Sequence, residues 1–206
     1  WELLTQVWKI PPDRLYATVF AGEKQEGLET DLEAEKIWIQ EMGLPPERVL
    51  RFGKKENFWE MGNTGPCGPC SEIHIDRGPG TCDHEGQPDH ECKVNGDCSR
   101  YMEIWNLVFI QFNRRDDGKL DSLPAKHVDT GMGFERLVSV LQNKNSNYDT
   151  DSFTPIIAQV EEISGKKYQS GTSEADVAFR AISDHIRALC SAFADGVLPS
   201  NTGRGY

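Results

Sequence analysis

Residues 126–138 read KHVDTGMGFERLV, and this stretch indicates both a fold and a kind of chemistry. We expect a short, buried strand that ends at Asp129, a turn lined by Gly131 and Gly133, and an apolar helix with Arg136 in its first turn. A carboxylate at the end of a sheet, beside backbone that glycine leaves accessible, suits an ammonium group with three donors. The arginine suits a phosphate. The stretch therefore predicts part of a site that activates amino acids.

A long strand candidate, YMEIWNLVFIQFNR at 101–114, precedes this stretch and favours the same interpretation. Within it, Asn106 and Val108 point to the same face because side chains alternate along a strand. The amide can hold a carboxylate while the valine shapes a small pocket. The alternative is ordinary: Asp129 is a turn or cap residue, Arg136 is a surface charge, and the strand is a packing strand.

Strand candidates come first along the chain, and helices follow. RLYATVF at 14–20, ENFWEMG at 56–62 and SEIHID at 71–76 read as strands, whereas the glycines and prolines of NTGPCGPC at 63–70 predict an irregular loop. From position 134 the apolar period is helical, and the last helix carries one stripe formed by Ala178, Ile182, Ile186, Leu189 and Phe193. This order predicts an α+β fold: an antiparallel β-sheet flanked by helices, with a mostly helical C-terminal portion.

Composition limits the class of protein. The 206 residues carry 22 Lys and Arg against 33 Asp and Glu, and the net charge of -11 has the wrong sign for a surface that binds nucleic acid by neutralising phosphates. No apolar run is long enough to cross a bilayer and no leader peptide opens the chain, so we expect a cytoplasmic protein without a membrane partner. The chain starts at Trp1 within a helical pattern, which predicts a piece of a longer protein.

Six blocks of sequence go further: NFWEMG, TGPCGPCSEI, EIWNLVFIQFNR, DTGMGFERL, SNYDTD, and DHIRA with ADGVLPSNTGRGY. In this order, from Trp1 to Tyr206, they resemble the catalytic domain of the alanyl-tRNA synthetase family, class II aminoacyl-tRNA synthetases of bacterial type. The resemblance implies the class II antiparallel sheet, with GMGFER as the third class-defining motif. It also implies alanine, ATP and tRNA(Ala) as partners, with Mg²⁺ accompanying ATP.

The resemblance also implies roles for single residues. These are Trp59 as a wall of the alanine pocket, Asn106 for the substrate carboxylate, Val108 for the side of the pocket, Asp129 with Gly131 for the amino group, and Gly133 with Arg136 for ATP. A pocket for a methyl group works by exclusion, and it cannot strongly reject glycine or serine, because one methylene or hydroxyl changes binding by only about 1–3 kcal/mol. Such an enzyme needs editing elsewhere.

The resemblance assigns residues 1–143 to the C-terminal part of the catalytic domain, with a Cys/His-rich insertion at 78–100, and residues 144–206 to the start of a helical tRNA-recognition region. It implies formation of alanyl-adenylate and transfer of alanine to tRNA, and it implies that the chain is inactive alone, because the first two class motifs would precede Trp1. A non-catalytic paralogue that binds an amino acid or adenylate is the alternative. Asn63, where the family usually has Asp, slightly favours it.

The cysteines allow a further alternative, a zinc or thiol redox module. Five possible metal ligands lie in a stretch too polar to form a core, and four of them would suffice for a structural zinc site: Cys82, His84, His90, Cys92 and Cys98. A metal-free loop is the other interpretation of that stretch. The sequence CGPC at 67–70 matches a redox dithiol, but SEIHID after it does not read as a helix, which favours a structural loop.

Overall fold

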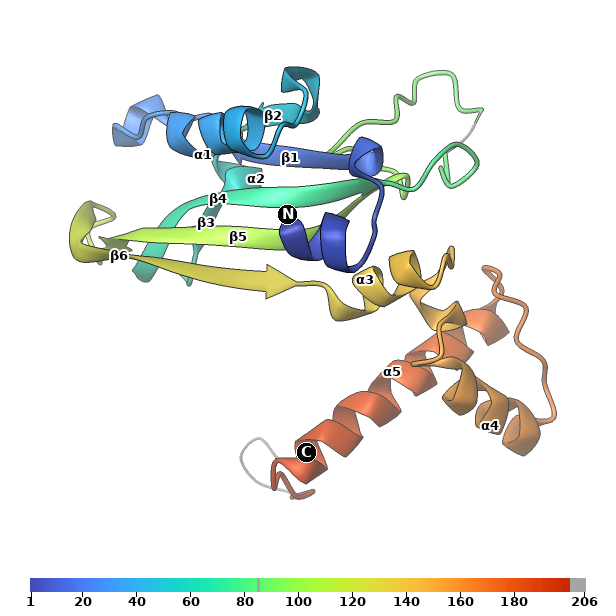
Figure 1. Cartoon of the computed structure of the whole chain (residues 1–206). Helices are drawn as coiled ribbons and strands as arrows, with labels where there is room; N and C mark the ends of the chain where they lie inside the picture. Colours follow the sequence, from blue (N-terminus) through green and yellow to red (C-terminus); the bar gives the residue numbers. More distant parts are fainter. Residues whose placement is uncertain (85, 201–206) are drawn as a thin grey trace. The chain divides into compact units, whose positions relative to one another are not determined.

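The computed structural model describes residues 1–84 and 86–200 (Figure 1). They form two compact units, one from Trp1 to Leu141 and one that begins at Gln142, each with a hydrophobic core of its own. The last six positions of the motif ADGVLPSNTGRGY, 201–206, lie outside the described residues.

The first unit is built on a mixed six-stranded sheet with the order β2-β1-β4-β5-β6, in which β3 pairs with β4. β1 and β2 run parallel, and the other pairs between described strands are antiparallel. The strands are β1 (Leu15–Phe20), β2 (Val49–Phe52), β3 (Phe58–Glu60), β4 (Gly65–Asp76), β5 (Tyr101–Arg114) and β6 (Leu120–Met132). Together with its helices, this sheet confirms the predicted α+β class.

The helices of the first unit are short. The α-helices are α1 (Leu32–Lys36), α2 (Lys54–Asn57) and α3 (Phe134–Leu141). The segments η1 (Leu3–Val7) and η4 (Ile37–Glu41) are single π-helical turns, and η2 (Pro12–Arg14), η3 (Lys24–Glu26) and η5 (Pro46–Arg48) are short 3₁₀-helices. Asp31 begins α1, because its Oδ1 accepts a hydrogen bond from the Ala34 amide at 3.0 Å. Gly43, with a φ of 75°, ends the segment that continues through η4.

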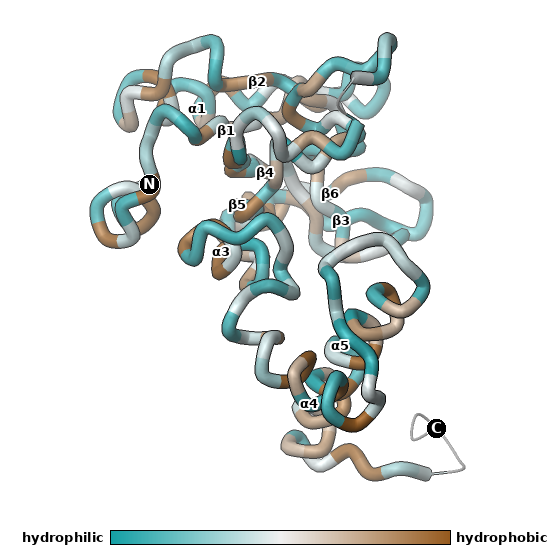
Figure 2. The backbone as a smooth tube through the Cα atoms, turned by 90° about the vertical axis from the view of Figure 1, so that its right-hand side faces the viewer, coloured by the Kyte–Doolittle hydropathy of each residue, from teal (hydrophilic) through white to brown (hydrophobic). Residues whose placement is uncertain are grey.

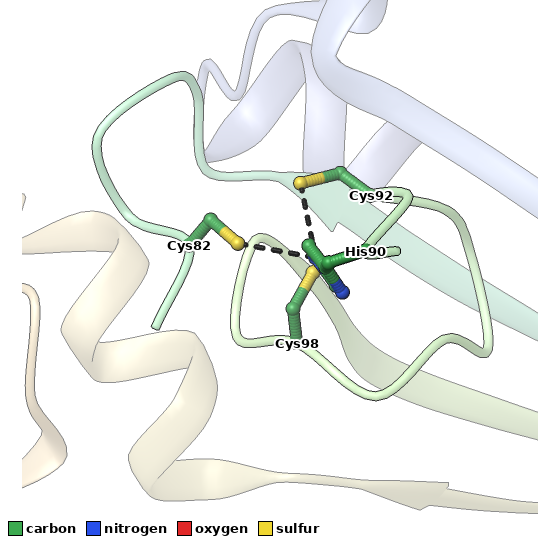
Figure 3. A group of neighbouring side chains, drawn as sticks. All are labelled: Cys82, His90, Cys92 and Cys98. Atoms are coloured by element: carbon green, nitrogen blue, oxygen red, sulfur yellow. Dashed lines mark hydrogen bonds between the residues drawn. The ribbon is translucent and has the colours of Figure 1, made fainter. Parts of the chain in front are cut away.

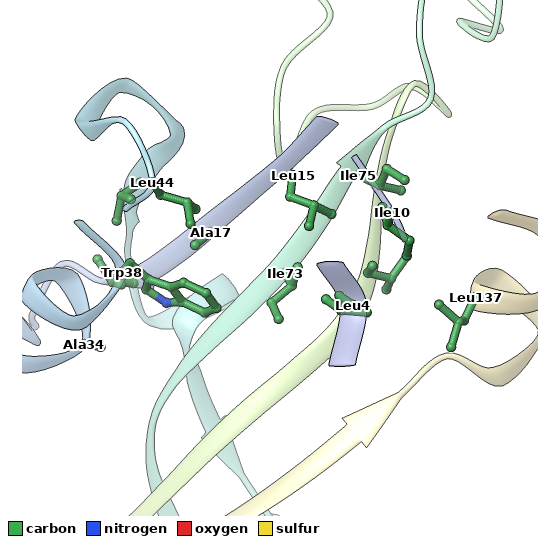
Figure 4. Close-up of a cluster of buried hydrophobic side chains, with 13 residues drawn as sticks. Leu4, Ile10, Leu15, Ala17, Ala34, Trp38, Leu44, Ile73, Ile75 and Leu137 are labelled. Atoms are coloured by element: carbon green, nitrogen blue, oxygen red, sulfur yellow. The ribbon is translucent and has the colours of Figure 1, made fainter. Parts of the chain in front are cut away.

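One face of the sheet carries the main core (Figure 4). Ala17, Ile73 and Trp105 are register partners across β1, β4 and β5, and partners in an antiparallel pair project to the same side. Trp38 from η4 packs into this core, where its indole Nε1 donates to Ser71 Oγ at 2.8 Å. Because buried polar groups need partners, this bond lets the indole lie against the sheet without a desolvation penalty.

The prediction of an irregular loop at 63–70 is wrong for most of this segment. β4 begins at Gly65 and runs for 12 residues without interruption, so GPCGPC is part of a strand. Pro66 and Pro69 cannot donate to a ladder, but the register of β4 against β5 shifts within this stretch. Glycine and proline here mark a bulge, which sequence reasoning mistook for a loop.

Gly68 marks the closest approach of β4 to β5. A Cβ atom at Gly68 would lie 2.0 Å from the carbonyl oxygen of Phe109, closer than any real contact. Only glycine therefore allows the two strands to stay paired at the bulge.

The strand that carries Asp129 is longer and more exposed than the sequence suggested. β6 spans 13 residues and is the last strand in the order of the sheet, so β5 is its one partner among the described strands. Val128, an apolar residue inside it, is 71% exposed. The expectation of a short, buried strand is wrong, because an apolar pattern does not reveal whether another element covers it.

The second unit contains η6 (Asn147–Asp149), α4 (Thr154–Ser164) and α5 (Glu174–Ala194). Its core is formed by Phe153, Ile157 and Phe179. Ser173 caps α5, since its Oγ accepts from the Asp176 amide at 3.1 Å.

The apolar stripe expected on α5 is present in the sequence of the helix but not in the core of this unit. Ile182, Ile186, Leu189 and Phe193 are 44–49% exposed within the described residues. Figure 2 shows hydrophobic and hydrophilic stretches alternating along α5, as an amphipathic helix requires. No described helix is both long enough and apolar enough to span a membrane.

Candidate active site

Strand register brings four of the predicted substrate residues together. Asn106 on β5 lies opposite Gly131 on β6, and Val108 lies opposite Asp129. Directly opposite residues in an antiparallel pair share a face of the sheet, and so do residues two apart on one strand. The four positions therefore form two adjacent rows on one face, the face opposite to the main core.

β4 extends both rows. Glu72 lies opposite Asn106, and Cys70 lies opposite Val108. Each row thus crosses three strands, with an acidic residue at one end of each: Glu72 on β4 and Asp129 on β6. The face is polar where the opposite face is apolar, which is the arrangement of a binding surface on a half-covered sheet.

A hollow of about 530 Å³ opens over this face. Trp59 of β3 and Asn106 of β5 line it, together with Cys70 and Glu72 of β4 and the turn 95–97. The other predicted substrate residues lie outside its lining in the described chain: Val108, Asp129, Gly131, Gly133 and Arg136. The hollow therefore joins the Trp59 wall to Asn106, while the β6 residues flank it along the rows.

The Asn106 side chain ends in a buried oxygen, Oδ1, that has no hydrogen-bond partner within the described residues. A buried polar atom left unpaired costs about 1–3 kcal/mol, which a ligand can recover. The terminal amide can present either its oxygen or its NH₂ group to a ligand. Asn106 can therefore accept from an ammonium group or donate to a carboxylate.

Glu72 lies at the centre of a buried polar network that sequence reasoning missed. Its Oε2 accepts hydrogen bonds from Thr18 Oγ1 at 3.0 Å and from Asn95 Nδ2 at 3.1 Å, and it lies 3.0 Å from His74 Nε2. Burial by itself raises the pKa of Glu72, but the hydrogen bonds from these three partners hold that pKa below its ordinary value. Glu72 is therefore a carboxylate at neutral pH.

The sequence held a signal for this network. In SEIHID, Glu72 and His74 alternate with Ile73 and Ile75, so the two polar side chains share the face opposite to the isoleucines. All four side chains are buried. Two titratable residues on the covered part of a strand indicate a polar site, whatever the strand itself looks like.

Asp129 and Gly131 offer an accessible carboxylate and accessible backbone. Both are exposed, and Asp129 Oδ1 accepts from the Thr130 amide at 2.8 Å. A Cβ atom at Gly131 would meet no heavy atom within 4 Å, so the backbone there is open to a ligand. This pair has the chemistry to bind an ammonium group.

Arg136 is held at the junction of β6 and α3. Its Nη1 donates to the Glu103 carbonyl oxygen at 2.9 Å and lies 3.5 Å from Glu103 Oε2. Its Cδ packs over Gly133, where a Cβ atom would come within 3.0 Å. A guanidinium has five N–H donors, so one nitrogen bound to Glu103 leaves donors for a phosphate.

The Cys/His-rich insertion forms one compact ligand group (Figure 3). The ligand atoms of Cys82, His90, Cys92 and Cys98 all lie within 4.8 Å of one another. Cys82 Sγ is 3.2 Å and Cys92 Sγ is 3.5 Å from His90 Nε2. Tetrahedral zinc, with bonds of about 2.3 Å to sulfur and about 2.0 Å to nitrogen, places its ligand atoms about 3.5–3.8 Å apart. Three cysteines and one histidine thus fit zinc in kind and number, and their ligand atoms, within 4.8 Å of one another, lie close to this spacing.

His84, the fifth candidate ligand, is not a member of this group. Its Nδ1 lies 3.3 Å from Gln87 Oε1, and its ring stacks on that of His90 with the centroids 5.1 Å apart. His84 therefore supports the position of the His90 ring. The ligand group consists of three cysteines and one histidine.

The insertion leaves the sheet and returns to it at one point. Asp76 ends β4, and its two carboxylate oxygens accept from Arg100 Nε at 2.7 Å and Nη2 at 2.8 Å. The Arg77 amide also donates to the Arg100 carbonyl at 2.9 Å. Because Asp76 pairs with Tyr101 in the ladder, the two ends of the insertion are neighbours in the sheet.

The CGPC thiols are not activated. Cys67 and Cys70 lie buried on β4 and not at a helix N-terminus. Burial, followed by the charge of Glu72, raises the pKa of the Cys70 thiol to about 12, and burial raises that of Cys67 as well. A redox dithiol needs a lowered pKa, so the thiol redox alternative lacks its reactive group.

Comparison with known proteins agrees with this geometry. Residues 1–206 match the family described as tRNA synthetases class II (A). The chain is 52% identical over 207 residues to the alanine–tRNA ligase of Chlorobium luteolum, and 53% identical over 212 residues to the cytoplasmic alanine–tRNA ligase of Dictyostelium discoideum. It is 52% identical over 212 residues to the mitochondrial alanine–tRNA ligase of Saccharomyces cerevisiae.

These alignments cover 100% of the chain but 21% or 22% of each relative, so the chain spans about one fifth of the length of the curated relatives it matches. The family match includes every position that the six sequence blocks singled out, and it confirms the resemblance drawn from them. The chain belongs to the class II tRNA synthetases (A).

Proposed function

We propose that this chain forms the alanine-binding part of an alanine–tRNA ligase, an enzyme that activates alanine with ATP and transfers it to tRNA(Ala). The observation that carries the proposal is the pair of register partners Asn106–Gly131 and Val108–Asp129. They put an amide, a small branched side chain, a carboxylate and open backbone on one face of the sheet. The names of the relatives support the same substrate.

Each end of alanine has a partner in this proposal. The Asn106 amide donates to the substrate carboxylate, while Asp129 and the backbone at Gly131 accept from the ammonium group. Trp59 and Val108 leave room for a methyl group and exclude larger side chains. Glycine and serine still enter, because a hydrophobic pocket discriminates them by only about 1–3 kcal/mol, so hydrolysis of mischarged tRNA falls to another part of the protein.

ATP binds through Arg136 at the turn that contains Gly133. One oxygen of the alanine carboxylate attacks the α-phosphorus, a phosphorus–oxygen bond forms, and pyrophosphate leaves with the electron pair of the broken bond. Arg136 offsets charge on the phosphates, and Mg²⁺ bound with ATP would neutralise further charge there. The carboxylate is already a nucleophile, so positioning replaces general base catalysis. A ribose hydroxyl of tRNA then takes the alanyl group and AMP leaves.

The two parts of the chain differ in role under this proposal. Residues 1–143 belong to the catalytic domain and residues 144–206 begin a helical region that recognises tRNA. The net charge of -11 leaves most phosphate contacts to other parts of the longer protein. We place the protein in the cytoplasm; one relative is named cytoplasmic and another mitochondrial.

A structural zinc ion completes the proposal, held by Cys82, His90, Cys92 and Cys98. The insertion has few apolar side chains, so a metal supplies the cross-link that a core would otherwise provide. Metal analysis of the purified protein should find one zinc per chain. Cys98→Ser should lose it, whereas His84→Ala should keep it; equal loss in both variants would contradict this ligand set.

Alanine-dependent exchange of pyrophosphate into ATP tests the catalytic proposal in the intact protein. We expect exchange, and we expect Asp129→Ala to reduce it at least tenfold, because the ammonium group loses its charged partner. Asp121→Ala, on the same strand, should exchange normally. The 206-residue chain alone should not exchange. Binding of a non-hydrolysable alanyl-adenylate mimic without any exchange by the intact protein would favour the non-catalytic paralogue.

A further inference from the structure

Residues 93–97 form a turn enclosed by two ligands of the metal group. Cys92 precedes the turn and Cys98 follows it, and both sulfur atoms belong to the cluster of four. The Gly96 amide donates to the Lys93 carbonyl oxygen at 3.1 Å, which closes the turn. Val94 is 2% exposed, so its buried side chain anchors the turn in the protein. A metal that holds both cysteines therefore fixes a loop of five residues.

Asn95, at the tip of this turn, reaches into the polar network of the sheet. Its Nδ2 donates to Glu72 Oε2 at 3.1 Å, across 23 positions of sequence. Its φ of 56° is in the left-handed region, which asparagine tolerates better than most residues. The turn is thus shaped to deliver one amide to one buried carboxylate.

The same turn is a wall of the hollow over the site. Asn95, Gly96 and Asp97 line it together with Trp59 and Asn106. Glu72, which Asn95 contacts, is the register partner of Asn106. The contact from the insertion therefore ends one strand away from the residue proposed to hold the substrate carboxylate.

We infer that the metal-centred turn 93–97 forms one wall of the alanyl-adenylate pocket, and that Asn95 is a positioning residue that acts through Glu72. The inference rests on the proposed function. The metal holds the turn, the turn holds the Asn95 amide, and the amide fixes the Glu72 carboxylate beside Asn106. Each hydrogen bond to the buried Glu72 carboxylate restricts its position, and the loss of one donor loosens it.

Calorimetry with a non-hydrolysable alanyl-adenylate mimic, combined with zinc analysis, tests the inference in the intact protein. Asn95→Ala should keep its zinc and bind the mimic about tenfold more weakly, since a hydrogen bond to a charged group is lost. Cys92→Ser should lose zinc and weaken binding to a similar extent. Glu91→Gln, beside the same ligand but exposed, should keep both.

A double-mutant cycle separates positioning from a general loss of structure. In a Glu72→Gln background, Asn95→Ala should cost little further affinity, because its partner is already changed. If Cys92→Ser does not fold, chelation of zinc from the unaltered protein replaces it. Amide hydrogen exchange should then show lost protection at 93–97, and affinity for the mimic should fall about tenfold as in Asn95→Ala.

The outcomes distinguish a failure of the inference from a failure of the proposed function. If the unaltered protein binds the mimic and Asn95→Ala binds it equally well, the inference is wrong and the proposed function stands. Additive losses for Asn95→Ala and Glu72→Gln would also overturn it, since the two residues would act independently. If the unaltered protein does not bind the mimic, the proposed function fails and the inference falls with it.

Discussion

Asn106 and Gly131 lie directly opposite each other on β5 and β6, so the amide proposed to bind the carboxylate of alanine faces the backbone proposed to bind its ammonium group. The two strands of one hairpin thus carry the proposed binding partners of both ends of alanine. The span between them is set by the spacing of strands in a sheet, about 4.8 Å.

Asn106→Asp should raise the KM for alanine about tenfold to a hundredfold. The change keeps the shape of the side chain but replaces an NH₂ donor by a carboxylate, which repels the carboxylate of the substrate. Alanine-dependent pyrophosphate exchange measures it. Asn113→Asp, farther along β5, should leave the KM unchanged, and an unchanged KM in Asn106→Asp would remove that residue from the site.

Arg136→Ala should weaken the binding of ATP but not the binding of alanine. The guanidinium is the proposed phosphate ligand, and a charge-assisted hydrogen bond contributes about 1.5–3 kcal/mol. We expect exchange at fixed ATP to fall by about ten- to a hundredfold, with the KM for alanine nearly constant. Arg115→Ala, at an exposed turn, is the control. A rise in the KM for alanine alone would assign Arg136 a different role.

Gly68→Ala should prevent stable folding of the sheet. The added Cβ would lie 2.0 Å from the Phe109 carbonyl oxygen, and backbone at a strand pair cannot move aside cheaply. We expect a loss of about 3 kcal/mol or more in the free energy of unfolding, measured by urea denaturation. Gly53→Ala, where a Cβ meets nothing within 4 Å, should cost little. Equal stability of the two variants would refute the bulge geometry.

Glu72 should make the protein sensitive to acid. Its pKa in the folded state lies below the unfolded value, so its contribution to stability is complete above the unfolded pKa of about 4.3 and is lost as the pH falls through the folded pKa. Glu72→Gln should therefore be less stable than the unaltered protein at pH 7, and the gap should narrow below about pH 4. Urea denaturation across this range measures it, with exposed Glu47→Gln as control.

Cysteine alkylation should distinguish two classes of thiol. Cys70 is buried with a pKa raised to about 12, whereas Cys190 on α5 is exposed. At pH 7.5, iodoacetamide should modify Cys190 and leave Cys70 intact until denaturant is added. Mass spectrometry of the peptides reads this out. Rapid modification of Cys70 in the native protein would restore the thiol redox alternative.

Sequence reasoning recovered the elements whose pattern is local. The strand 101–114, the helices that follow position 134 and the α+β class all rest on periodicity that a single segment displays. GPCGPC misled it, because Gly68 and Pro69 serve a bulge whose need arises only when β5 lies alongside. The same limit applies to β6: its exposure depends on the order of strands, not on its own residues.

Some residues of the candidate site could likewise be predicted from the sequence, and others could not. Motif resemblance supplied Trp59, Asn106, Val108, Asp129 and Arg136, and these roles remain predictions. It did not supply Glu72: His74 lies on the same strand, but the partners Thr18 and Asn95 come from two other segments of the chain. No pattern within one segment joins them, because the contact from Asn95 exists only after the insertion has folded back over the sheet.

The ion pair between Asp76 and Arg100 makes the folding of the sheet independent of the sequence and length of the insertion. Because this ion pair joins the two ends of the insertion at the sheet, the pairing of β4 with β5 does not depend on how many residues lie between them. The entropic cost of closing a longer loop grows only with the logarithm of its length. Residues 78–99 can therefore be shortened, extended or exchanged as a cassette without changing the register of the strands. An exchange that omits the Asn95 turn should still yield a folded sheet, but one whose pocket has lost a wall.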